Sequence, residues 1–416
     1  MAGKITAQLK YLSQVAGIPV YGLSHLAERD KNLWVFGSTF GKRFADNPKY
    51  FYLYMNQHHK EIRAVWISHD EKIVKYLQKH KLPAYHYHSK EGMEICLHAG
   101  VYIYDNYSKD ISFWLSGGAL KINLWHGIPL KKIQMDNIFD KVRHPENAWK
   151  AFYWKLRRMS DEKPEDYVLT TSEHLRPVFS SAFATAHVFT SGYPRNDGFY
   201  FPEKIKNLRM PVELNMLRRL GKYGEKAAED SQEEGSRLVL YMPTFRESET
   251  LFFEKTDVEG LRTWLRQNGT KLLIKLHPKS KLWERFSKLS SDEMLLLLPE
   301  ADPYVFLPYA DALITDYSSI YFDYLLMDRP VIFYNYDYEA YLSQSRELYF
   351  DYEEMTPGKK ARDGAGLLEG LEGIRFTDHT DGYEKERKRV REYVFDHPEE
   401  LASERLCQEI MDVLRA

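Results

Sequence analysis

The sequence predicts an α/β protein built from two doubly wound domains, each around a parallel β-sheet. Two observations lead to this prediction. The chain has 416 residues, which is more than one ordinary hydrophobic core supports. Short apolar runs also alternate with helical patterns along most of it, as expected when buried parallel strands are covered by helices on both faces. The alternation comes in two series, with a charged segment between them.

The first series predicts an N-terminal domain over residues 1–202. Its strand-like runs are continuous and apolar, and the stretches between them, such as Glu71–His80, have the spacing of amphipathic helices. The expected strands are Leu33–Phe36, Ala64–Ile67, Val101–Tyr104, Ile122–Trp125, Val168–Thr171 and Val188–Thr190.

The second series predicts a C-terminal domain over residues 237–382, with helices such as Gly260–Gln267 and Ile320–Met327. Residues 203–236 are charged and contain three glycines, which favours an inter-domain connection. Residues 383–416 have a helical pattern and are expected to form a C-terminal helix. The expected strands of this domain are Leu238–Tyr241, Leu272–Leu276, Ala312–Thr315 and Val331–Tyr334.

The composition excludes several classes of protein. A net charge of -2 gives no global field that would attract nucleic acid. The 2 cysteines, Cys96 and Cys407, are too few and too far apart for a disulfide scaffold, and they fit a reducing compartment. No apolar run reaches the roughly 20 residues that span a bilayer, and Met1–Asp30 lacks the pattern of a signal peptide. We therefore expect a protein of the cytosol or of the inner face of a membrane.

A histidine follows one of the predicted strands. His126 and Gly127 come directly after Ile122–Trp125, and Pro129 suits the first turn of a following helix. Ligands bind at the carboxyl ends of strands in parallel sheets, and an imidazole is a suitable general base. The alternative is a packed or surface histidine of a loop.

A second motif joins a buried strand to a helix. Thr315 ends the strand, and Asp316, Ser318 and Ser319 precede the helix. The free N–H groups of a helix start can bind a diphosphate. Equally, the aspartate and the serines can be simple helix caps.

Two further strand ends carry cations. Lys275 and His277 follow one strand, and Arg246 follows another. Cations at these places can offset phosphate charge, and an arginine can do so with two parallel hydrogen bonds. The alternatives are a solvated basic turn and a surface ion pair.

Other motifs are weaker. The run Ser191–Asp197 has the chemistry of a turn, and Gly37 allows close approach of the backbone after the first strand. His58-His59 and His86-Tyr-His88 lack a convincing third metal ligand, so no metal site is predicted. The phosphate-binding and dinucleotide-binding glycine motifs are absent, which disfavours nucleotide hydrolysis and redox chemistry.

Taken together and in this order, the motifs resemble those of the CDP-glycerol glycerophosphotransferase family, which builds teichoic acids and capsule polymers. The resemblance extends from about Asn32 to Gly358. Glu347 and Leu348 depart from it, because a small or aromatic pair is expected before Tyr349. The motifs that carry it are Trp125–Gly127, Gly192–Asp197, Pro243–Arg246, Lys275–Pro278, Ile314–Ser319, Phe322-Asp323, Arg329-Pro330 and Tyr349–Gly358.

The resemblance implies a GT-B architecture, in which two Rossmann-like domains face a cleft. It also implies that His126 is the general base and that Asp316 is its partner in catalysis or in donor placement. The implied donor-binding residues are Arg246, Lys275, His277, Ser318, Ser319, Thr315, Pro243 and Thr244. The residues expected on the acceptor or cleft side are Gly127, Lys131, Gly37, Ser38, Arg195 and Asp197.

The implied activity is transfer of glycerol phosphate from CDP-glycerol to a hydroxyl of a lipid-linked saccharide acceptor, carried on a polyprenyl diphosphate, with release of CMP. No cofactor or metal is expected. Three alternatives stay open: a ribitol-phosphate transferase that uses CDP-ribitol, a sugar-nucleotide glycosyltransferase of the same architecture, and an inactive scaffold of a polymer-assembly complex. The sequence leaves the choice between primase and polymerase, and the oligomeric state, undecided.

One aromatic and basic segment is a candidate for the membrane surface. Its pattern is helical and is typical of an interfacial helix on the inner face of the cell membrane. The alternative is a helix buried against its own domain. The candidate residues are Trp149, Phe152, Trp154, Lys155, Arg157 and Arg158.

Overall fold

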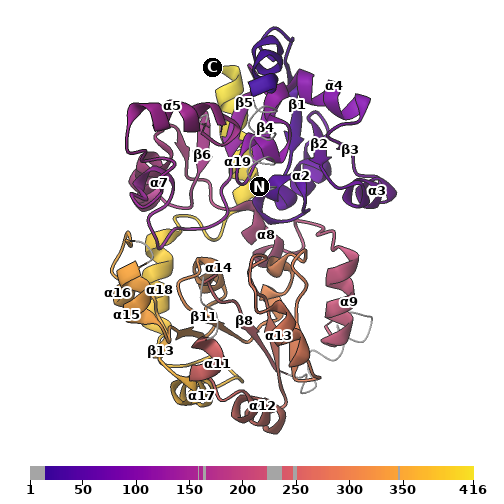
Figure 1. The fold of residues 1–416 in the computed structure, drawn as a ribbon. Helices are drawn as coiled ribbons and strands as arrows, with labels where there is room; N and C mark the ends of the chain where they lie inside the picture. The colour runs from indigo at the N-terminus through magenta and orange to yellow at the C-terminus, as the bar shows by residue number, and fades with distance from the viewer. Residues whose placement is uncertain (1–14, 158, 163–164, 223–236, 247–250, 345–346) are drawn as a thin grey trace. The chain divides into compact units, whose positions relative to one another are not determined.

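The computed structural model describes residues 15–157, 159–162, 165–222, 237–246, 251–344 and 347–416. The chain divides into two compact units (Figure 1). Unit 1 comprises Met1–His126, Ile133–Asn207 and Phe395–Ala416, and unit 2 comprises Gly127–Lys132 and Leu208–Val394. Each unit is an α/β structure around a parallel sheet, so the predicted fold class is confirmed at this level.

Unit 1 contains a sheet with the strand order β3-β2-β1-β4-β5-β6-β7, in which every pairing is parallel. The chain starts in the middle of this sheet, builds one side with β2 and β3, and then crosses to the other side. The strands are β1 (Asp30–Phe36), β2 (Arg63–Ser68), β3 (Ala84–His86), β4 (Ala99–Tyr104), β5 (Leu120–Asn123), β6 (Tyr167–Leu169) and β7 (Val188–Phe189).

Helices connect these strands, and local capping explains several of the starts. The side chain of Asp70 accepts a hydrogen bond from the N–H of Lys72 at the start of α3, and Ser89 does the same for Gly92 at α4. Residues 15–24 are also helical. The helices of unit 1 are α2 (Asp46–His58), α3 (Glu71–Lys79), α4 (Lys90–His98), α5 (Ala148–Arg157), α6 (Met159–Glu162), α7 (Arg176–Phe183), α8 (Pro194–Tyr200) and α19 (Ala402–Arg415).

Unit 2 repeats the same plan with the strand order β10-β9-β8-β11-β12-β13, again all parallel. Its strands are β8 (Arg237–Tyr241), β9 (Thr270–Ile274), β10 (Met294–Leu296), β11 (Ala312–Thr315), β12 (Val331–Tyr334) and β13 (Lys359–Ala361). Its helices are α9 (Pro211–Arg219), α11 (Leu251–Lys255), α12 (Val258–Gln267), α13 (Trp283–Lys288), α14 (Ile320–Tyr324), α15 (Tyr338–Gln344), α16 (Tyr352–Met355), α17 (Gly364–Glu372) and α18 (Glu384–Val394).

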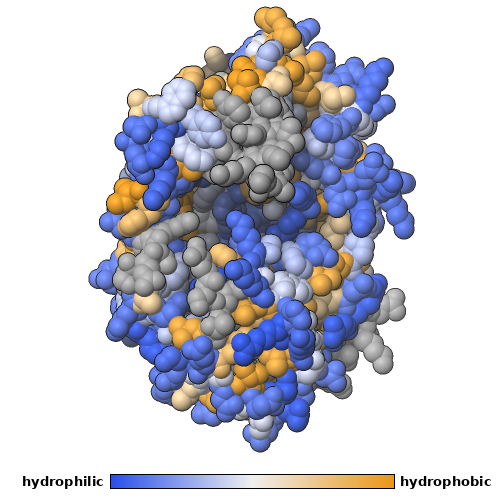
Figure 2. Space-filling model, viewed as in Figure 1, coloured by the Kyte–Doolittle hydropathy of each residue, from blue (hydrophilic) through white to orange (hydrophobic). Residues whose placement is uncertain are grey.

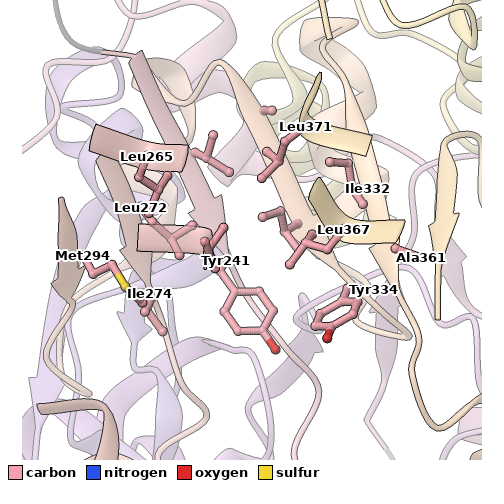
Figure 3. Close-up of a cluster of buried hydrophobic side chains, with 14 of the residues drawn as sticks. Tyr241, Leu265, Leu272, Ile274, Met294, Ile332, Tyr334, Ala361, Leu367 and Leu371 are labelled. Carbon is pink, nitrogen blue, oxygen red and sulfur yellow. The ribbon is translucent and has the colours of Figure 1, made fainter. Parts of the chain in front are cut away.

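Each unit has its own hydrophobic core. In unit 2, side chains of α12 and α17 pack on one face of the sheet, as Leu265, Leu367 and Leu371 show in Figure 3. In unit 1, a corresponding cluster includes Val35 and Val65 of the central strands. Two separate cores explain why the apolar runs of the sequence form two series, because each sheet buries its own set.

The sequence missed three strands, and all three lie at sheet edges. They are β3, β10 and β13, each three residues long. In β3 and β13, His86, Lys359 and Lys360 interrupt the apolar run that would have indicated a strand, whereas the edge strand β7 was predicted from its apolar residues. The predicted C-terminal helix is also two helices, α18 and α19, with residues 395–401 between them.

The compact units group the chain differently from the predicted domain boundaries. Gly127–Lys132 packs with unit 2, although it lies inside the stretch assigned to the first domain. In the reverse direction, residues 395–416 pack with unit 1. Of the expected connection over 203–236, residues 223–236 lie outside the described part. The chain therefore passes between the units at four places instead of one.

Apolar groups are spread over the face shown in Figure 2 as separate patches in a mainly hydrophilic surface. None of the helices in the described part of the chain has both the length and the low charge that a bilayer-spanning segment needs.

Candidate active site

Each unit has a topological switch point, where the strand order reverses and ligands commonly bind in folds of this kind. In unit 1 it lies between β1 and β4, and in unit 2 between β8 and β11. An aspartate stands at the end of the second strand in both cases: Asp105 after β4 and Asp316 after β11. Both carboxylates are buried.

In unit 1, the loop after β1 binds to Asp105. The hydroxyl of Ser38 donates to one carboxylate oxygen at 2.6 Å, and the N–H of Thr39 donates to the other at 2.9 Å. Gly37 lies against the backbone of Asp110, where an added Cβ would meet the carbonyl oxygen at 2.7 Å. Ser38 is fully buried. The structure therefore gives Gly37 and Ser38 a supporting role, and not the exposed acceptor contact that the sequence suggested.

The neighbouring carboxylates of unit 1 are strongly perturbed. Burial, and then the charge of Asp46, raise the pKa of Asp105. Burial and the adjacent Asp105 raise the pKa of Asp110 well above its ordinary value. The N–H groups of Phe40, Asn106 and Tyr107 donate to Asp110 and hold it in place.

His126 follows β5, next to this cluster, and its side chain is exposed. Its Nδ1 lies 3.1 Å from the carbonyl oxygen of Asp105. A carbonyl oxygen only accepts hydrogen bonds, so Nδ1 carries the proton and Nε2 of the neutral ring is left as the acceptor. The structure thus presents a ring nitrogen that can remove a proton, as a general base requires.

In unit 2, the loop after β8 binds to Asp316. The N–H of Thr244 donates to both carboxylate oxygens, at 2.9 and 3.0 Å. The guanidinium of Arg246 lies 2.7 Å from Asp316 and also pairs with Asp337, which follows β12. Another of its N–H groups donates to the carbonyl of Thr244 at 2.9 Å. Arg246 is therefore directed at groups of its own unit.

The charges of this cluster fix one another. Burial alone would raise the pKa of Asp316, but the charge of Arg246 and the hydrogen bonds of Thr244 bring it below its ordinary value. Burial likewise acts to lower the pKa of Arg246, but Asp316 and Asp337 outweigh it and raise the pKa. Asp316 is thus a permanently ionised carboxylate, which is a poor proton carrier near neutral pH.

A pocket lies at the carboxyl ends of β8 and β9 in unit 2. It has a volume of about 320 Å³, including its open mouth. Of the predicted donor-binding residues, it brings together Pro243, Thr244, Arg246 and His277. The other lining residues are Tyr241, Phe245, Phe252, Leu276, Ser280, Leu282, Phe286 and Tyr336. The mixture of aromatic rings with a few polar groups is typical of a small-molecule site.

His277 stands at the edge of this pocket, among cations. Burial and then the charges of Lys279, Lys131 and Lys275 lower its pKa. Its Nδ1 accepts a hydrogen bond from the N–H of Lys279 at 3.2 Å. Nε2 therefore carries the proton and is the donor, which suits contact with a phosphate oxygen.

Lys131 belongs to this side and not to unit 1. Its Nζ donates to the hydroxyl of Tyr341 at 2.6 Å, and its charge also acts on Asp316. The segment around it pairs with residues 347–349: Lys131 forms a bridge with Leu348, and Lys132 pairs with Glu347 at 2.6 Å. Glu347 and Leu348 are thus among the residues that hold this segment. The acceptor-side expectation for Lys131 and Gly127 is corrected to unit 2.

Two other predicted donor residues, Lys275 and Thr315, have different surroundings. Lys275 is buried and donates to the carbonyls of Leu298 and Pro299, at 2.7 and 2.8 Å. The hydroxyl of Thr315 donates to the carbonyl of Met242 at 2.8 Å. Both side chains therefore donate to carbonyl groups of neighbouring segments of unit 2.

Ser318 and Ser319 are partly exposed at the start of α14. Ser319 is the N-cap residue by position, yet its side chain makes no capping hydrogen bond. The helix is only five residues long. A helix this short has a weak dipole, so it offers a weaker anion site than the sequence suggested. The two hydroxyl groups are not engaged as caps.

Arg195 and Asp197 are both buried. Arg195 pairs with Asp46 at 2.7 Å, and the carboxylate of Asp197 accepts hydrogen bonds from the N–H groups of Ala402 and Ser403, at 2.9 and 2.8 Å. Asp197 thereby caps α19. The expectation that these two residues face the acceptor is replaced by a structural role, which the turn chemistry of the motif also allowed.

Sequence reasoning missed Asp337, Tyr341 and Asp105. Asp337 and Asp105 each follow a buried strand, a signal that could have found them, because side chains at strand ends meet at one edge of the sheet. Tyr341 lies within α15 and gives no such signal.

The predicted membrane segment is α5 and the residue after it. Trp149 and Phe152 are 73% and 55% exposed. Three more exposed apolar residues of unit 1 precede the helix: Met135, Ile138 and Phe139. Trp154 is half-buried and Lys155 is exposed. The side chain of Arg157 and all of Arg158 lie outside the described part.

Among the described residues, one group of possible metal ligands is close enough to share an ion: His397, Glu399 and Glu400, all exposed. Its atoms lie within 4.8 Å of one another, an arrangement that exposed acidic groups often have without an ion. It contains none of the candidate site residues.

Comparison with known proteins adds to this geometry. Residues 20–412 match the family described as CDP-Glycerol:Poly(glycerophosphate) glycerophosphotransferase. A teichoic acid glycerol-phosphate transferase of Staphylococcus aureus is 29% identical over 403 residues, which cover 92% of this chain and 93% of that protein. A teichoic acid ribitol-phosphate primase of Bacillus spizizenii is 26% identical over 302 residues, 70% of this chain and 69% of that protein.

Among solved structures, the wall teichoic acid polymerase TagF matches with a TM-score of 0.71 at 21% identity, covering 100% of this chain and 98% of the other. This likeness concerns the fold, and it confirms the predicted GT-B class of two Rossmann-like domains.

Proposed function

The chain belongs to the CDP-glycerol:poly(glycerophosphate) glycerophosphotransferase family, and from this premise we propose that it transfers glycerol phosphate from CDP-glycerol to a hydroxyl of a lipid-linked acceptor. Membership makes it a transferase of the CDP-alditol phosphotransferase class. The products are the extended acceptor and CMP. The process to which this step belongs is teichoic acid synthesis, the setting of the Staphylococcus aureus relative.

The observation that carries the proposal is the pocket of unit 2, which lies at the carboxyl end of β8, the first strand of its topological switch point. A pyrophosphate needs hydrogen-bond donors and positive charge. His277 offers an Nε2–H there, and Lys131 and Lys279 add charge close to it. Ser318 and Ser319 offer hydroxyl groups at the end of the adjacent strand β11. We therefore assign donor binding to these five residues.

Arg246 and Asp316 enter the proposal in a different role from the one expected. Their ion pair is buried and holds the loop after β8 against β11. Such a pair shapes the pocket wall and keeps it rigid, which pre-organises the groups that touch the donor. We propose that both act as positioning residues.

His126 supplies the general base. The acceptor hydroxyl oxygen attacks the phosphorus that bears the glycerol, and the bond from this phosphorus to the oxygen of CMP breaks. The hydroxyl proton passes to Nε2 of His126, the ring nitrogen that the bond to Asp105 leaves unprotonated. Gly127–Lys132, which belongs to unit 2, follows His126 directly in sequence.

CDP-ribitol is the second candidate donor, and the similarity to the ribitol-phosphate primase is the observation that favours it. A glycosyltransferase would release a nucleoside diphosphate instead of CMP, and a scaffold would release neither.

We further propose that the acceptor is a saccharide on a polyprenyl diphosphate and that the protein works at the inner face of the cell membrane. Two exposed aromatic residues on α5, with Lys150 and Lys155 beside them, support this placement. Apolar side chains of this kind insert into the acyl boundary, while lysines attract anionic headgroups.

The proposal is tested by incubating the protein with CDP-glycerol, or with CDP-ribitol, and a lipid-linked disaccharide acceptor, and by measuring CMP and product length. We expect CMP with CDP-glycerol. His126→Gln should lower kcat by about 10²–10⁴-fold, because it removes the base but keeps a polar side chain of similar size. Its unfolding midpoint should stay at the wild-type value, since His126 is exposed.

Three results would contradict the proposal. A nucleoside diphosphate as product would indicate glycosyl transfer, and no turnover with either donor would indicate a scaffold. Normal CMP release by His126→Gln would remove this residue from the mechanism.

A further inference from the structure

Trp125, the residue before His126, has a backbone conformation that needs an explanation. Its φ angle is +51°, in the left-handed region. An L-residue with a Cβ pays roughly 1–2 kcal/mol for this conformation, and a bulky side chain rarely adopts it. Strain of this kind persists only where surrounding groups hold the residue, and it occurs preferentially at functional sites.

Two buried asparagines hold the peptide groups on both sides of Trp125. Asn123, the last residue of β5, accepts a hydrogen bond from the N–H of Trp125 at 2.9 Å. Asn47, in α2, donates to the carbonyl of Trp125 at 2.9 Å and to that of Leu124 at 3.1 Å. Both side chains are fully buried. Three hydrogen bonds from two distant parts of unit 1 thus fix the strained loop.

The asparagines are themselves held in place. The Nδ2 of Asn123 donates to the carbonyl of Asn106 at 3.1 Å and to Glu165 at 3.0 Å. The Oδ1 of Asn47 accepts a hydrogen bond from the N–H of Arg195 at 3.2 Å. Each amide therefore has its oxygen and nitrogen assigned by its partners, and neither can flip without losing contacts.

The conformation of Trp125 decides where the next side chain points. The ring of His126 lies 4.0 Å from the Trp125 ring, between centroids, and its Nδ1 reaches the carbonyl of Asp105. The indole in turn packs on Phe183, with the centroids 4.9 Å apart. Without the turn at Trp125 the imidazole would leave Asp105, and the preference for a proton on Nδ1 would be lost.

We propose that Asn47 and Asn123 are positioning residues for His126: they hold Trp125 in its left-handed conformation, and so orient the imidazole and fix its tautomer. This inference rests on the proposed function only where it concerns turnover. The statement about orientation and tautomer stands on unit 1 alone.

A purely structural role is the competing explanation, and the chain offers a matched control. Asn56 lies on the same helix, α2, and its Nδ2 also donates to two carbonyls, those of Tyr52 at 3.0 Å and Ala64 at 3.5 Å. It touches no residue of the loop around His126. Asn56→Ala should therefore cost hydrogen bonds of the same kind without disturbing the imidazole.

The direct test is nitrogen NMR of protein labelled at histidine, with the His126 signals assigned by their loss in His126→Gln. In the wild type at a pH where the ring is neutral, we expect the Nδ1–H tautomer. In Asn47→Ala and Asn123→Ala we expect a shift toward the Nε2–H tautomer that is usual for an imidazole in water. Asn56→Ala should keep the wild-type signals.

The same variants separate positioning from binding in kinetics. Loss of orientation should lower kcat by about tenfold or more, because a general base contributes about 10²–10⁴-fold to the rate and the variants lose part of this. The KM for CDP-glycerol should stay within about twofold of the wild-type value. The donor contacts of unit 2 are untouched by these changes. Asn56→Ala should retain wild-type kcat.

Several outcomes would overturn the inference. An Nε2–H tautomer in the wild type would do so without any variant. Wild-type histidine signals in folded Asn47→Ala and Asn123→Ala would also do so; if Asn47→Ala does not fold, Asn47→Ser removes the same pair of donated bonds with a smaller loss of volume. If Asn47→Ala and Asn123→Ala show the expected tautomer shift but the wild-type protein releases no CMP, the proposed function is wrong and the positioning role stands.

Discussion

At the residue scale, Arg246 pairs with two acidic side chains of unit 2 and also lines the pocket of that unit. Arg246 neutralises Asp316 and Asp337, which end two neighbouring parallel strands. Two carboxylates at one sheet edge would repel each other in a poorly solvated place. The arginine between them removes this repulsion and ties the loop after β8 to the sheet.

We predict that Arg246→Ala lowers the free energy of unfolding by about 3–5 kcal/mol, because it removes the ion-pair partner of the buried Asp316 and the partly buried Asp337. Urea unfolding measures this loss. Adding Asp337→Asn should recover part of it, since one of the charges is then gone.

Arg266→Ala is the control, because this arginine pairs with Glu293 while 66% exposed. Its loss should be within about 1 kcal/mol, as for most surface pairs. A folded Arg246→Ala protein of nearly wild-type stability with a greatly raised KM for CDP-glycerol would instead favour a phosphate clamp.

At the scale of elements, the last two helices belong to different units. Arg387 of α18 is fully buried and pairs with Asp381 at 2.5 Å and Asp328 at 3.2 Å, all in unit 2. Helix α19 is capped by Asp197 of unit 1. The end of the chain therefore returns to the first unit, where Asp197 and Ser191 bind helix α19.

This cap predicts a pH effect on stability. Burial raises the pKa of Asp197 to about 7, from 3.8 in the unfolded chain. A raised pKa means that the folded state holds the proton more tightly, so its contribution to stability is complete below about pH 4 and is lost as the pH rises through 7. Wild-type stability should fall over this interval by an amount of the order of a few kcal/mol.

Asp197→Asn should flatten that slope, whatever its effect on absolute stability. Thermal or urea unfolding between pH 4 and pH 8 measures it. Asp257→Asn, at the exposed N-cap of α12, should keep the wild-type slope. Equal slopes for the wild type and Asp197→Asn would show that another group carries the pH dependence.

Helix α5 carries a prediction about lipid surfaces. We expect binding to vesicles of phosphatidylglycerol and phosphatidylcholine, and a loss of at least about tenfold in Trp149→Ser/Phe152→Ser, because a large apolar side chain contributes about 1.5–3 kcal/mol when buried. Flotation measures the bound fraction. Leu23→Ser/Leu26→Ser, at residues 66% and 81% exposed elsewhere in unit 1, is the control and should bind normally. Absence of wild-type binding, or equal loss in both variants, would end the proposal.

At the scale of the whole molecule, both units use one plan. In each, an aspartate at the end of a central strand accepts hydrogen bonds from the loop of the neighbouring strand: Asp105 with Ser38 and Thr39, and Asp316 with Thr244. The results differ. The unit 1 aspartate supports an exposed histidine through its carbonyl, whereas the unit 2 aspartate pairs with an arginine at a pocket.

The sequence by itself determined the fold class, the central strands and the position of His126 after β5. These features depend on the local order of apolar and polar residues, because a buried strand or helix face requires apolar residues at a regular spacing. The edge strands β3 and β13 were missed, since polar residues interrupt their apolar runs.

Only the tertiary structure decided which polar residues pair with each other. Arg246 and Lys275 were predicted to bind phosphate, and the structure adds that they contact Asp337, Leu298 and Pro299 of their own unit. Asp197 finds its partners in a helix more than 200 positions further along the chain. The sequence shows that a side chain is charged but not which group it pairs with, because the packing of distant segments determines its partner.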